Sequence, residues 1–414
     1  MSDKPASVSV NGRDYKWPSR PVCVVCIDGS EPAYIEKAIE MGVMPYMKEA
    51  LAKGADLRAD CVIPSFTNPN NMSIVTGQPP KVHGICGNYF YDMENDTEVM
   101  MNEPRFLRVP TIFKAFQDEG AKIAVVTAKD KLRRMLGNEL DFSKGTAISF
   151  SSEKSNETNM AEHGIENASE WLGREVPSVY SAELSEFIFA AGVKLADEFK
   201  PDLMYLSTTD YIQHKHAPGT PVANEFYAML DKYMAQLDER GFVIGMTADH
   251  GMKPKHTGKG EPDVIFLQDV LDEWLGKGKS RVILPITDPY VVHHGALGSF
   301  ATAYLPEEGR EEIIAKLAAM DGMMVALNRE EGCAKFELPE DRTGDVILVS
   351  DTNKVLGTSA DRHDLSALKE PLRSHGGISE QQVPLLCNKA VEGITADRRL
   401  RNFDVFDVAL NHAS

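Results

Sequence analysis

Short apolar runs that stop at an aspartate constrain this fold more than any other feature of the sequence. The runs and the residues that follow them are 21–27 with Asp28, 202–207 with Asp210, and 242–246 with Asp249 and His250. Apolar residues at helical spacing lie between them, at 34–52, 181–198 and 224–240. Strands that alternate with helices predict an α/β fold, with a mostly parallel sheet covered by helices on both faces. Such a sheet collects its functional residues at the carboxyl ends of its strands.

The pattern changes after about residue 256. The expected strands there are 281–285, 299–304, 323–327, 333–338 and 345–350, with one clear helix at 310–320. We therefore expect a core domain formed by residues 1–255 and completed by 371–414. Residues 256–370 are expected to form a small α+β cap inserted between these two parts.

The composition excludes several classes of protein. The chain has 414 residues, of which 43% are hydrophobic and 26% charged, as in ordinary globular proteins. No run approaches the 18 apolar residues of a membrane span, and the polar N-terminus lacks a signal region, so we expect a cytoplasmic protein. The net charge of -18 argues against nucleic acid and acidic membranes as partners.

The six cysteines do not indicate a metal or redox site. Cys23 and Cys26 have CxxC spacing but lie inside an apolar strand-like run, and no second pair lies at zinc-ribbon spacing. We interpret them as small buried hydrophobic residues.

Seven residues form a candidate site for two divalent cations. They are Asp28, Thr67, Asp210, His214, Asp249, His250 and His375. Asp210 and His214 are spaced i, i+4 and face the same side of a helix or turn, although a surface pair has the same spacing. Gly251 allows a sharp turn after Asp249 and His250. Mixed carboxylate and imidazole ligands favour zinc first and manganese second.

Thr67 is the candidate nucleophile. It precedes an expected helix that continues to about residue 75, and Pro69 suits the first turn of that helix. Backbone N–H groups and the helix dipole favour an anion at this position. Without metals, an ordinary N-cap would be the simpler interpretation.

Taken together, the motifs resemble the alkaline phosphatase superfamily, in its nucleotide pyrophosphatase/phosphodiesterase-like branch. They are Ile27-Asp28-Gly29, Pro64-Ser65-Phe66-Thr67-Asn68-Pro69-Asn70, Thr76-Gly77 with His83-Gly84-Ile85, Asp210 with His214, Thr247-Ala248-Asp249-His250-Gly251-Met252, and Ser374-His375-Gly376. The resemblance covers nearly all of residues 21–380. It implies that Asp210, His214 and His375 bind one zinc, that Asp28, Thr67, Asp249 and His250 bind the other, and that Thr67 is transiently phosphorylated.

Within this branch, the chain is most similar to the hydrolases that split the carbon–phosphorus bond of phosphonoacetate. This resemblance implies that Asn88 contacts the phosphoryl group, and that Lys129 and Lys131 hold the carboxylate of a small anionic phosphonate. From the residues alone, the two lysines could equally lie on a solvated loop.

Three other functions remain open at this point. A nucleotide pyrophosphatase or phosphodiesterase would need an aromatic slot, for which Phe66, Tyr89, Phe90 and Tyr211 are available. A phosphomutase would share the metal site but prefer manganese, and a non-catalytic metal-binding protein would not need Thr67.

The adjacent His293 and His294 would point to opposite faces of a strand, which favours a structural role. A homodimer is one assembly to consider.

Overall fold

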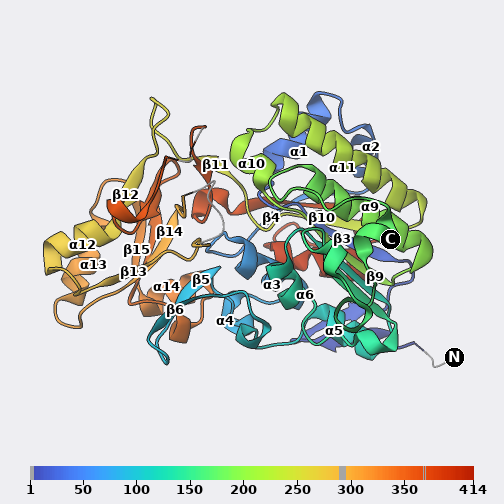
Figure 1. Cartoon of the computed structure of the whole chain (residues 1–414), viewed down its shortest axis with the longest axis horizontal. Helices are drawn as coiled ribbons and strands as arrows, with labels where there is room; N and C mark the ends of the chain where they lie inside the picture. Colours follow the sequence, from blue (N-terminus) through green and yellow to red (C-terminus); the bar gives the residue numbers. More distant parts are fainter. Residues whose placement is uncertain (1–3, 289–294, 367, 369) are drawn as a thin grey trace.

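A seven-stranded sheet forms the centre of the protein (Figure 1). The computed structural model describes residues 4–288, 295–366, 368 and 370–414. The strand order is β4 (Ala55–Asp60), β19 (Gln382–Cys387), β10 (Val243–Thr247), β3 (Val22–Cys26), β9 (Leu203–Ser207), β7 (Ile123–Thr127) and β8 (Ala147–Ser151). In this part of the chain, β19 is antiparallel to both of its neighbours, and the other pairings are parallel. The predicted mostly parallel sheet is confirmed.

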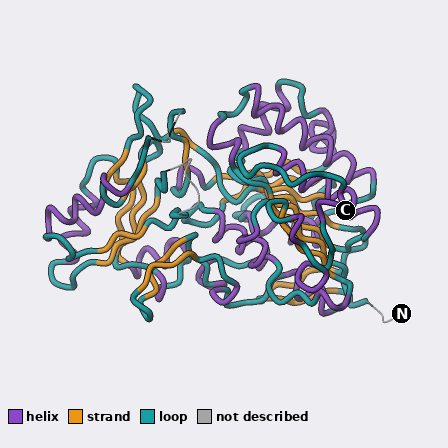
Figure 2. The backbone as a smooth tube through the Cα atoms, viewed as in Figure 1, coloured by secondary structure: helices purple, strands orange, loops and turns teal. Residues whose placement is uncertain are grey.

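Helices cover both faces of this sheet, as Figure 2 shows. One face packs against α1 (Pro32–Glu40), α9 (Glu183–Glu198) and α11 (Pro221–Glu239), and the other against α3 (Thr67–Thr76), α5 (Ile112–Asp118) and α6 (Asp130–Leu136). Successive strand residues alternate between the two cores, so Cys23 and Cys26 face opposite sides. All six cysteines are free and buried, which confirms their interpretation as core residues.

A second, antiparallel sheet lies apart from the first (Figure 1). Its order is β13 (Arg281–Ile283), β14 (Phe300–Tyr304), β16 (Val346–Ser350) and β15 (Met323–Asn328). The helices α12 (Leu267–Leu275), α13 (Arg310–Ala318) and α14 (Arg329–Phe336) and the parallel pair β12 (Val264–Phe266) and β17 (Val355–Gly357) accompany it. The short strands β11 (Lys253–Pro254) and β18 (Arg373–Ser374) pair antiparallel, so the chain leaves the first sheet and returns to it side by side.

Two predicted elements were wrong, and two helices between residues 256 and 370 were not predicted. The expected helix 34–52 is two helices, α1 and α2 (Pro45–Lys53), because Gly42 takes a left-handed conformation and Pro45 starts a new helix. The strand expected at 333–338 is part of α14, which begins where the Asn328 side chain accepts a hydrogen bond from the backbone N–H of Glu331. The helices α12 and α14 were missed beside the expected helix 310–320.

Shorter elements complete the described chain. They are the hairpins β1 (Ser7–Val10) with β2 (Arg13–Lys16) and β5 (Tyr89–Asp92) with β6 (Thr97–Met100), and the helices α4 (Pro80–His83), α7 (Met160–His163), α8 (Ala168–Leu172), α10 (Tyr211–Lys215) and α15 (Val405–Asp407). Within the described ranges, no helix has the length and apolar character needed to cross a bilayer. His293 and His294 lie outside the described residues.

Candidate metal centre and substrate pocket

Three aspartates meet at the carboxyl edge of the central strands. Asp28, Asp210 and Asp249 follow β3, β9 and β10, which are neighbours in the sheet. Burial raises the pKa of Asp28 well above its ordinary value, and the nearby Asp210 and Asp249 carboxylates raise it further. Buried carboxylates this close to one another repel unless protons or cations lie between them. The edge of the sheet is therefore suited to positive ions.

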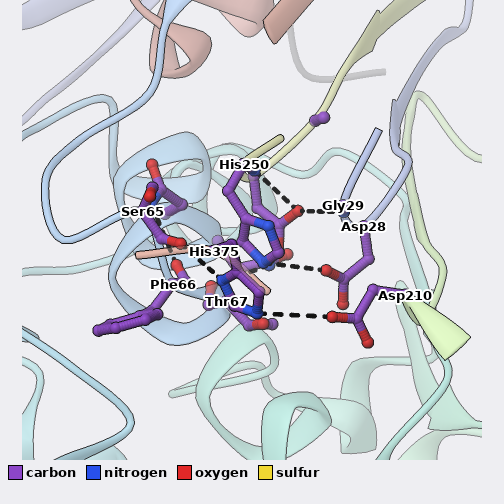
Figure 3. A network of polar contacts seen from close by, with 12 residues as sticks. Asp28, Gly29, Ser65, Phe66, Thr67, Asp210, His250 and His375 are labelled. Carbon is purple, nitrogen blue, oxygen red and sulfur yellow. Dashed lines mark hydrogen bonds and ion pairs between the residues drawn. The ribbon is translucent and has the colours of Figure 1, made fainter. Parts of the chain in front are cut away.

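His375 and Thr67 reach the same edge from segments next to β19 and β4, the two strands beyond β10 in the sheet. His375 precedes β19, and because β19 is antiparallel its start lies beside the carboxyl ends of the other strands. Thr67 begins α3, after a loop that leaves the end of β4. The two segments are joined at Ser65, whose backbone N–H donates to the carbonyl of Gly376 at 3.2 Å. Figure 3 shows His375, Thr67, Asp28 and Asp210 around one space.

Each of the three histidines has its Nδ1 atom within hydrogen-bond distance of a backbone carbonyl. The pairs are His214 with Arg373 (2.8 Å), His250 with Gly251 (2.9 Å) and His375 with Ser65 (2.8 Å). A carbonyl only accepts, so Nδ1 must carry the proton in each ring. The lone pair of the neutral imidazole is then on Nε2, the atom that faces the aspartates. Metal-binding histidines are typically oriented in this way.

The Nε2 atoms lie close to the carboxylates. His214 Nε2 is 2.8 Å from Asp210 Oδ2, and His250 Nε2 is 3.2 Å from Asp28 Oδ1. Two groups of ligand atoms, Asp210–His250–His375 and Asp28–Asp249–His250, each lie within 4.8 Å of one another. This donor set fits two candidate sites for divalent cations. His250 belongs to both groups, whereas the resemblance assigned it to one.

The pKa values of His250 and His375 shift in opposite directions. Burial by itself lowers the pKa of His250, but Asp249 and Asp28 outweigh it and raise the pKa to about 10. Burial, with His250 and His214 nearby, holds the pKa of His375 well below its ordinary value. The rings of His250 and His375 stack with centroids 3.6 Å apart. The two carboxylates thus favour a positive charge at this position, and a bound cation would supply it in place of a proton on Nε2.

A cavity of about 100 Å³ opens onto this centre. Seven of the ten predicted site residues line it, namely Asp28, Thr67, Asn88, Lys129, Lys131, Asp210 and His375. The other three, His214, Asp249 and His250, are buried behind the lining. His214 pairs with Asp210 and His250 with Asp28, and Asp249 Oδ2 lies 3.6 Å from His250 Nε2. The structure therefore brings all ten together around a cavity far smaller than the roughly 300–1,000 Å³ of sites for drug-sized ligands.

Asn88, Lys129 and Lys131 also line the cavity. The Asn88 Oδ1 atom accepts a hydrogen bond from the backbone N–H of Asn68 at 3.0 Å, so its amide NH₂ is the donor that it offers to the cavity. Lys129 and Lys131 follow β7 at the start of α6. Lys131 Nζ lies 3.4 Å from Asp288 Oδ1.

Asp288 and Thr208 are among the residues of this pocket that the sequence did not identify. Asp288 comes shortly after β13, and no local pattern links it to Lys131, so only the fold could place the two side by side. The Thr208 hydroxyl accepts a hydrogen bond from the backbone N–H of Asp28 at 3.0 Å. Its position at the end of β9, just before Asp210, was the signal that could have found it.

Four aromatic residues were candidates for a slot that binds a nucleotide base, namely Phe66, Tyr89, Phe90 and Tyr211. None of them is among the described residues that line the cavity. Phe66 is fully buried and packs its ring against His375 and Phe300. An aromatic slot for a base is therefore not part of this pocket.

Comparison with known proteins places these features in context. The sequence profile described as "Type I phosphodiesterase / nucleotide pyrophosphatase" matches residues 22–377. The crystal structure of phosphonoacetate hydrolase from Sinorhizobium meliloti 1021 in complex with phosphonoformate is 64% identical, with a TM-score of 0.96 over 99% of each chain. The structure of the same protein in complex with phosphonoacetate also has a TM-score of 0.96 over 99% of each chain.

The curated sequences are more distant. An uncharacterized pyrophosphatase/phosphodiesterase of Schizosaccharomyces pombe is 24% identical over 250 residues, which are 56% of this chain and 45% of that protein. The chain spans less than half the length of the curated relatives that it matches.

Proposed function

Because the chain belongs to the type I phosphodiesterase / nucleotide pyrophosphatase family, we propose that it hydrolyses the carbon–phosphorus bond of phosphonoacetate to acetate and phosphate. The observation that carries the proposal is the small cavity in which Thr67 and the two lysines Lys129 and Lys131 share one lining. A phosphonate at Thr67 and a carboxylate at the lysines use both ends of this cavity. The similarity to a hydrolase that binds phosphonoacetate supports the same substrate.

The chemistry proceeds in two displacements. The Thr67 hydroxyl loses its proton to water, and its Oγ forms a bond to phosphorus while the carbon–phosphorus bond breaks. The electron pair of that bond passes to the CH₂ carbon. That charge delocalises into the adjacent carboxylate as an enediolate, which takes up a proton to give acetate. Water then cleaves the P–O bond of phospho-threonine, releasing phosphate and restoring Thr67.

Lys129 and Lys131 contribute most in the transition state. The carboxylate gains negative charge only as the carbon–phosphorus bond breaks, so a cation beside it stabilises the transition state more than the bound substrate. The Asn88 amide, held by the backbone N–H of Asn68, donates to a phosphonate oxygen. The two lysines thus act on the carboxylate, and Asn88 acts on the phosphonate.

Two divalent cations complete the proposed centre. Asp210, His214 and His375 would hold one, and Asp28, Thr67, Asp249 and His250 the other, with zinc favoured over manganese by the mixture of imidazole and carboxylate. When bound, such a pair polarises phosphoryl oxygens and lowers the pKa of a coordinated hydroxyl.

The remaining predictions concern the domain architecture, the cellular compartment and the oligomeric state. Residues 256–370 form the proposed cap, and the side-by-side pairing of β11 with β18 at its two ends supports an insertion. Six buried free cysteines support a reducing compartment such as the cytoplasm. A homodimer stays a prediction.

The test compares two substrates with the zinc-loaded protein. Phosphate release from phosphonoacetate is expected to be much faster than cleavage of a nitrophenyl phosphodiester. Activity on the diester alone would move the function to phosphodiester cleavage, as in other members of the family.

A further inference from the structure

Asn71 links the candidate nucleophile to a candidate metal ligand. It lies on α3, one turn after Thr67, and is 1% exposed. Its side-chain NH₂ group donates to the backbone carbonyl of Thr67 at 3.0 Å and to Asp249 Oδ2 at 3.3 Å. A single amide therefore contacts both the segment that carries the hydroxyl and the carboxylate behind it.

The phenol of Tyr205 fixes the orientation of this amide. The Tyr205 hydroxyl donates to Asn71 Oδ1 at 2.7 Å. The Thr67 carbonyl and the Asp249 carboxylate only accept, so the NH₂ group must face them and Oδ1 must face the phenol. Burial, together with the Cys26 thiol, raises the pKa of Tyr205 well above its ordinary value, so the phenol remains a donor. The chain of donors runs in one direction, from Tyr205 to Asn71 to Asp249.

Tyr205 itself is held rigidly. It lies in β9, which pairs with β3 and β7 on its two sides, and the residue is fully buried. Its ring packs against those of Phe113 and Phe406, with centroids 5.7 and 6.3 Å away. The position of the hydroxyl is therefore set by the centre of the sheet, the most constrained part of the fold.

Asp249 receives hydrogen bonds on both oxygens. Its Oδ1 atom accepts from the backbone N–H groups of Gly29 at 3.2 Å and His250 at 3.0 Å. Asn71 supplies a side-chain donor to Oδ2, the oxygen that lies 3.6 Å from His250 Nε2. A rotation of the Asn71 amide would change the direction in which this carboxylate presents its lone pairs.

We propose that Asn71 and Tyr205 are a positioning pair that fixes the Asp249 carboxylate and the start of α3 relative to each other. Neither residue lines the cavity, so they act through Asp249 and Thr67 and not on the substrate. The inference rests on the proposed function in taking Asp249 as a metal ligand and Thr67 as the nucleophile. Hydrogen-bond partners behind a ligand typically change metal affinity or activity by about 10- to 100-fold.

The experiment measures zinc affinity by competition with a chelator, in the full-length protein and three variants. Tyr205→Phe removes only the hydroxyl and is expected to weaken binding of the zinc proposed at Asp249 about tenfold. Asn71→Leu is expected to weaken it by up to about 100-fold. The double variant is expected to match Asn71→Leu, because the phenol acts through the amide. In the same variants kcat should fall while KM for phosphonoacetate changes less than about twofold, since ground-state binding is retained.

The matched control is Ser73→Ala. Ser73 lies on the same helix, is fully buried, and shares a side-chain hydrogen bond of 2.8 Å with His83, away from the proposed ligands. Zinc affinity should be unchanged in this control. If Ser73→Ala and Tyr205→Phe lower the zinc affinity equally, the effect comes from general disruption of the core, and the proposal is overturned. A loss from Tyr205→Phe that persists undiminished in the Asn71→Leu background would also overturn it.

The zinc readout separates this proposal from the proposed function. Wild-type protein that binds two zinc ions but releases no phosphate from phosphonoacetate would refute the substrate and leave the affinity comparison valid. Unchanged zinc affinity in both single variants would refute the positioning pair while leaving the substrate assignment intact.

Discussion

A fully buried ion pair gives the sharpest stability prediction. The Lys255 ammonium lies 2.8 Å from Glu380 Oε1, and both side chains are 0% exposed. Lys255 also donates to the Thr352 carbonyl at 2.6 Å. Glu380 accepts from the backbone N–H of Gly377 through Oε2 at 2.9 Å and from the Ser379 hydroxyl through Oε1. Lys255→Met would remove one charge and leave the other buried.

The pair lies where two ligand-bearing segments meet. The Glu380 carbonyl accepts from the backbone N–H of Gly251, directly after His250, and its side chain accepts from Gly377, two residues after His375. Loss of one partner of a buried pair costs about 3–5 kcal/mol. With an unfolding entropy of about 2.1 cal/mol/K per residue, a chain of this length loses roughly 1 °C of Tm per kcal/mol. The expected decrease in Tm is therefore roughly 3–6 °C.

Differential scanning calorimetry on the zinc-loaded protein would test this value. Glu380→Gln should give a similar decrease, and Lys255→Met/Glu380→Gln should recover a large part of it, because no unpaired charge remains. Lys37→Met breaks the exposed pair with Glu40 and should leave Tm unchanged. Single variants with an unchanged Tm, or a double variant with additive losses, would show that the buried charges are not coupled as the geometry indicates.

Two further predictions concern the reaction, and a third concerns the pH dependence of folding stability. Thr67→Ala should abolish turnover while zinc content stays near two per chain, by metal analysis; undiminished turnover would remove Thr67 as the nucleophile. Lys129→Ala or Lys131→Ala should lower kcat/KM for phosphonoacetate by about 10²–10³ but hardly affect a nitrophenyl phosphodiester, and equal losses would contradict the carboxylate clamp. Burial lowers the pKa of His83 from 6.5 to about 3, so only the unfolded chain binds its proton between these values. Stability should therefore fall as the pH drops from 6.5 toward 3, and less steeply in His83→Gln; identical slopes would be inconsistent with a buried neutral His83.

The residue types of the site could be predicted because each follows a local signal. Asp28, Asp210 and Asp249 end apolar runs, and a strand end is visible in the sequence wherever an apolar run meets a polar turn. Thr67 precedes a helix whose first turn contains Pro69, and that helix is observed. The same local rules failed at 333–338, where the helix capped by Asn328 continues through the expected strand as far as Phe336.

The sequence by itself determined the α/β class, the run-ending aspartates and the chemical types of the candidate ligands. Only the tertiary structure decided that β10, β3, β9 and β7 are neighbours and that antiparallel β19 brings His375 to their carboxyl edge. It also decided the Nδ1 partners of the histidines and the contacts of Asp288 and Asn71. The physical reason is that hydrophobic periodicity is set by neighbours in the chain, whereas strand order and side-chain hydrogen bonds join residues hundreds of positions apart.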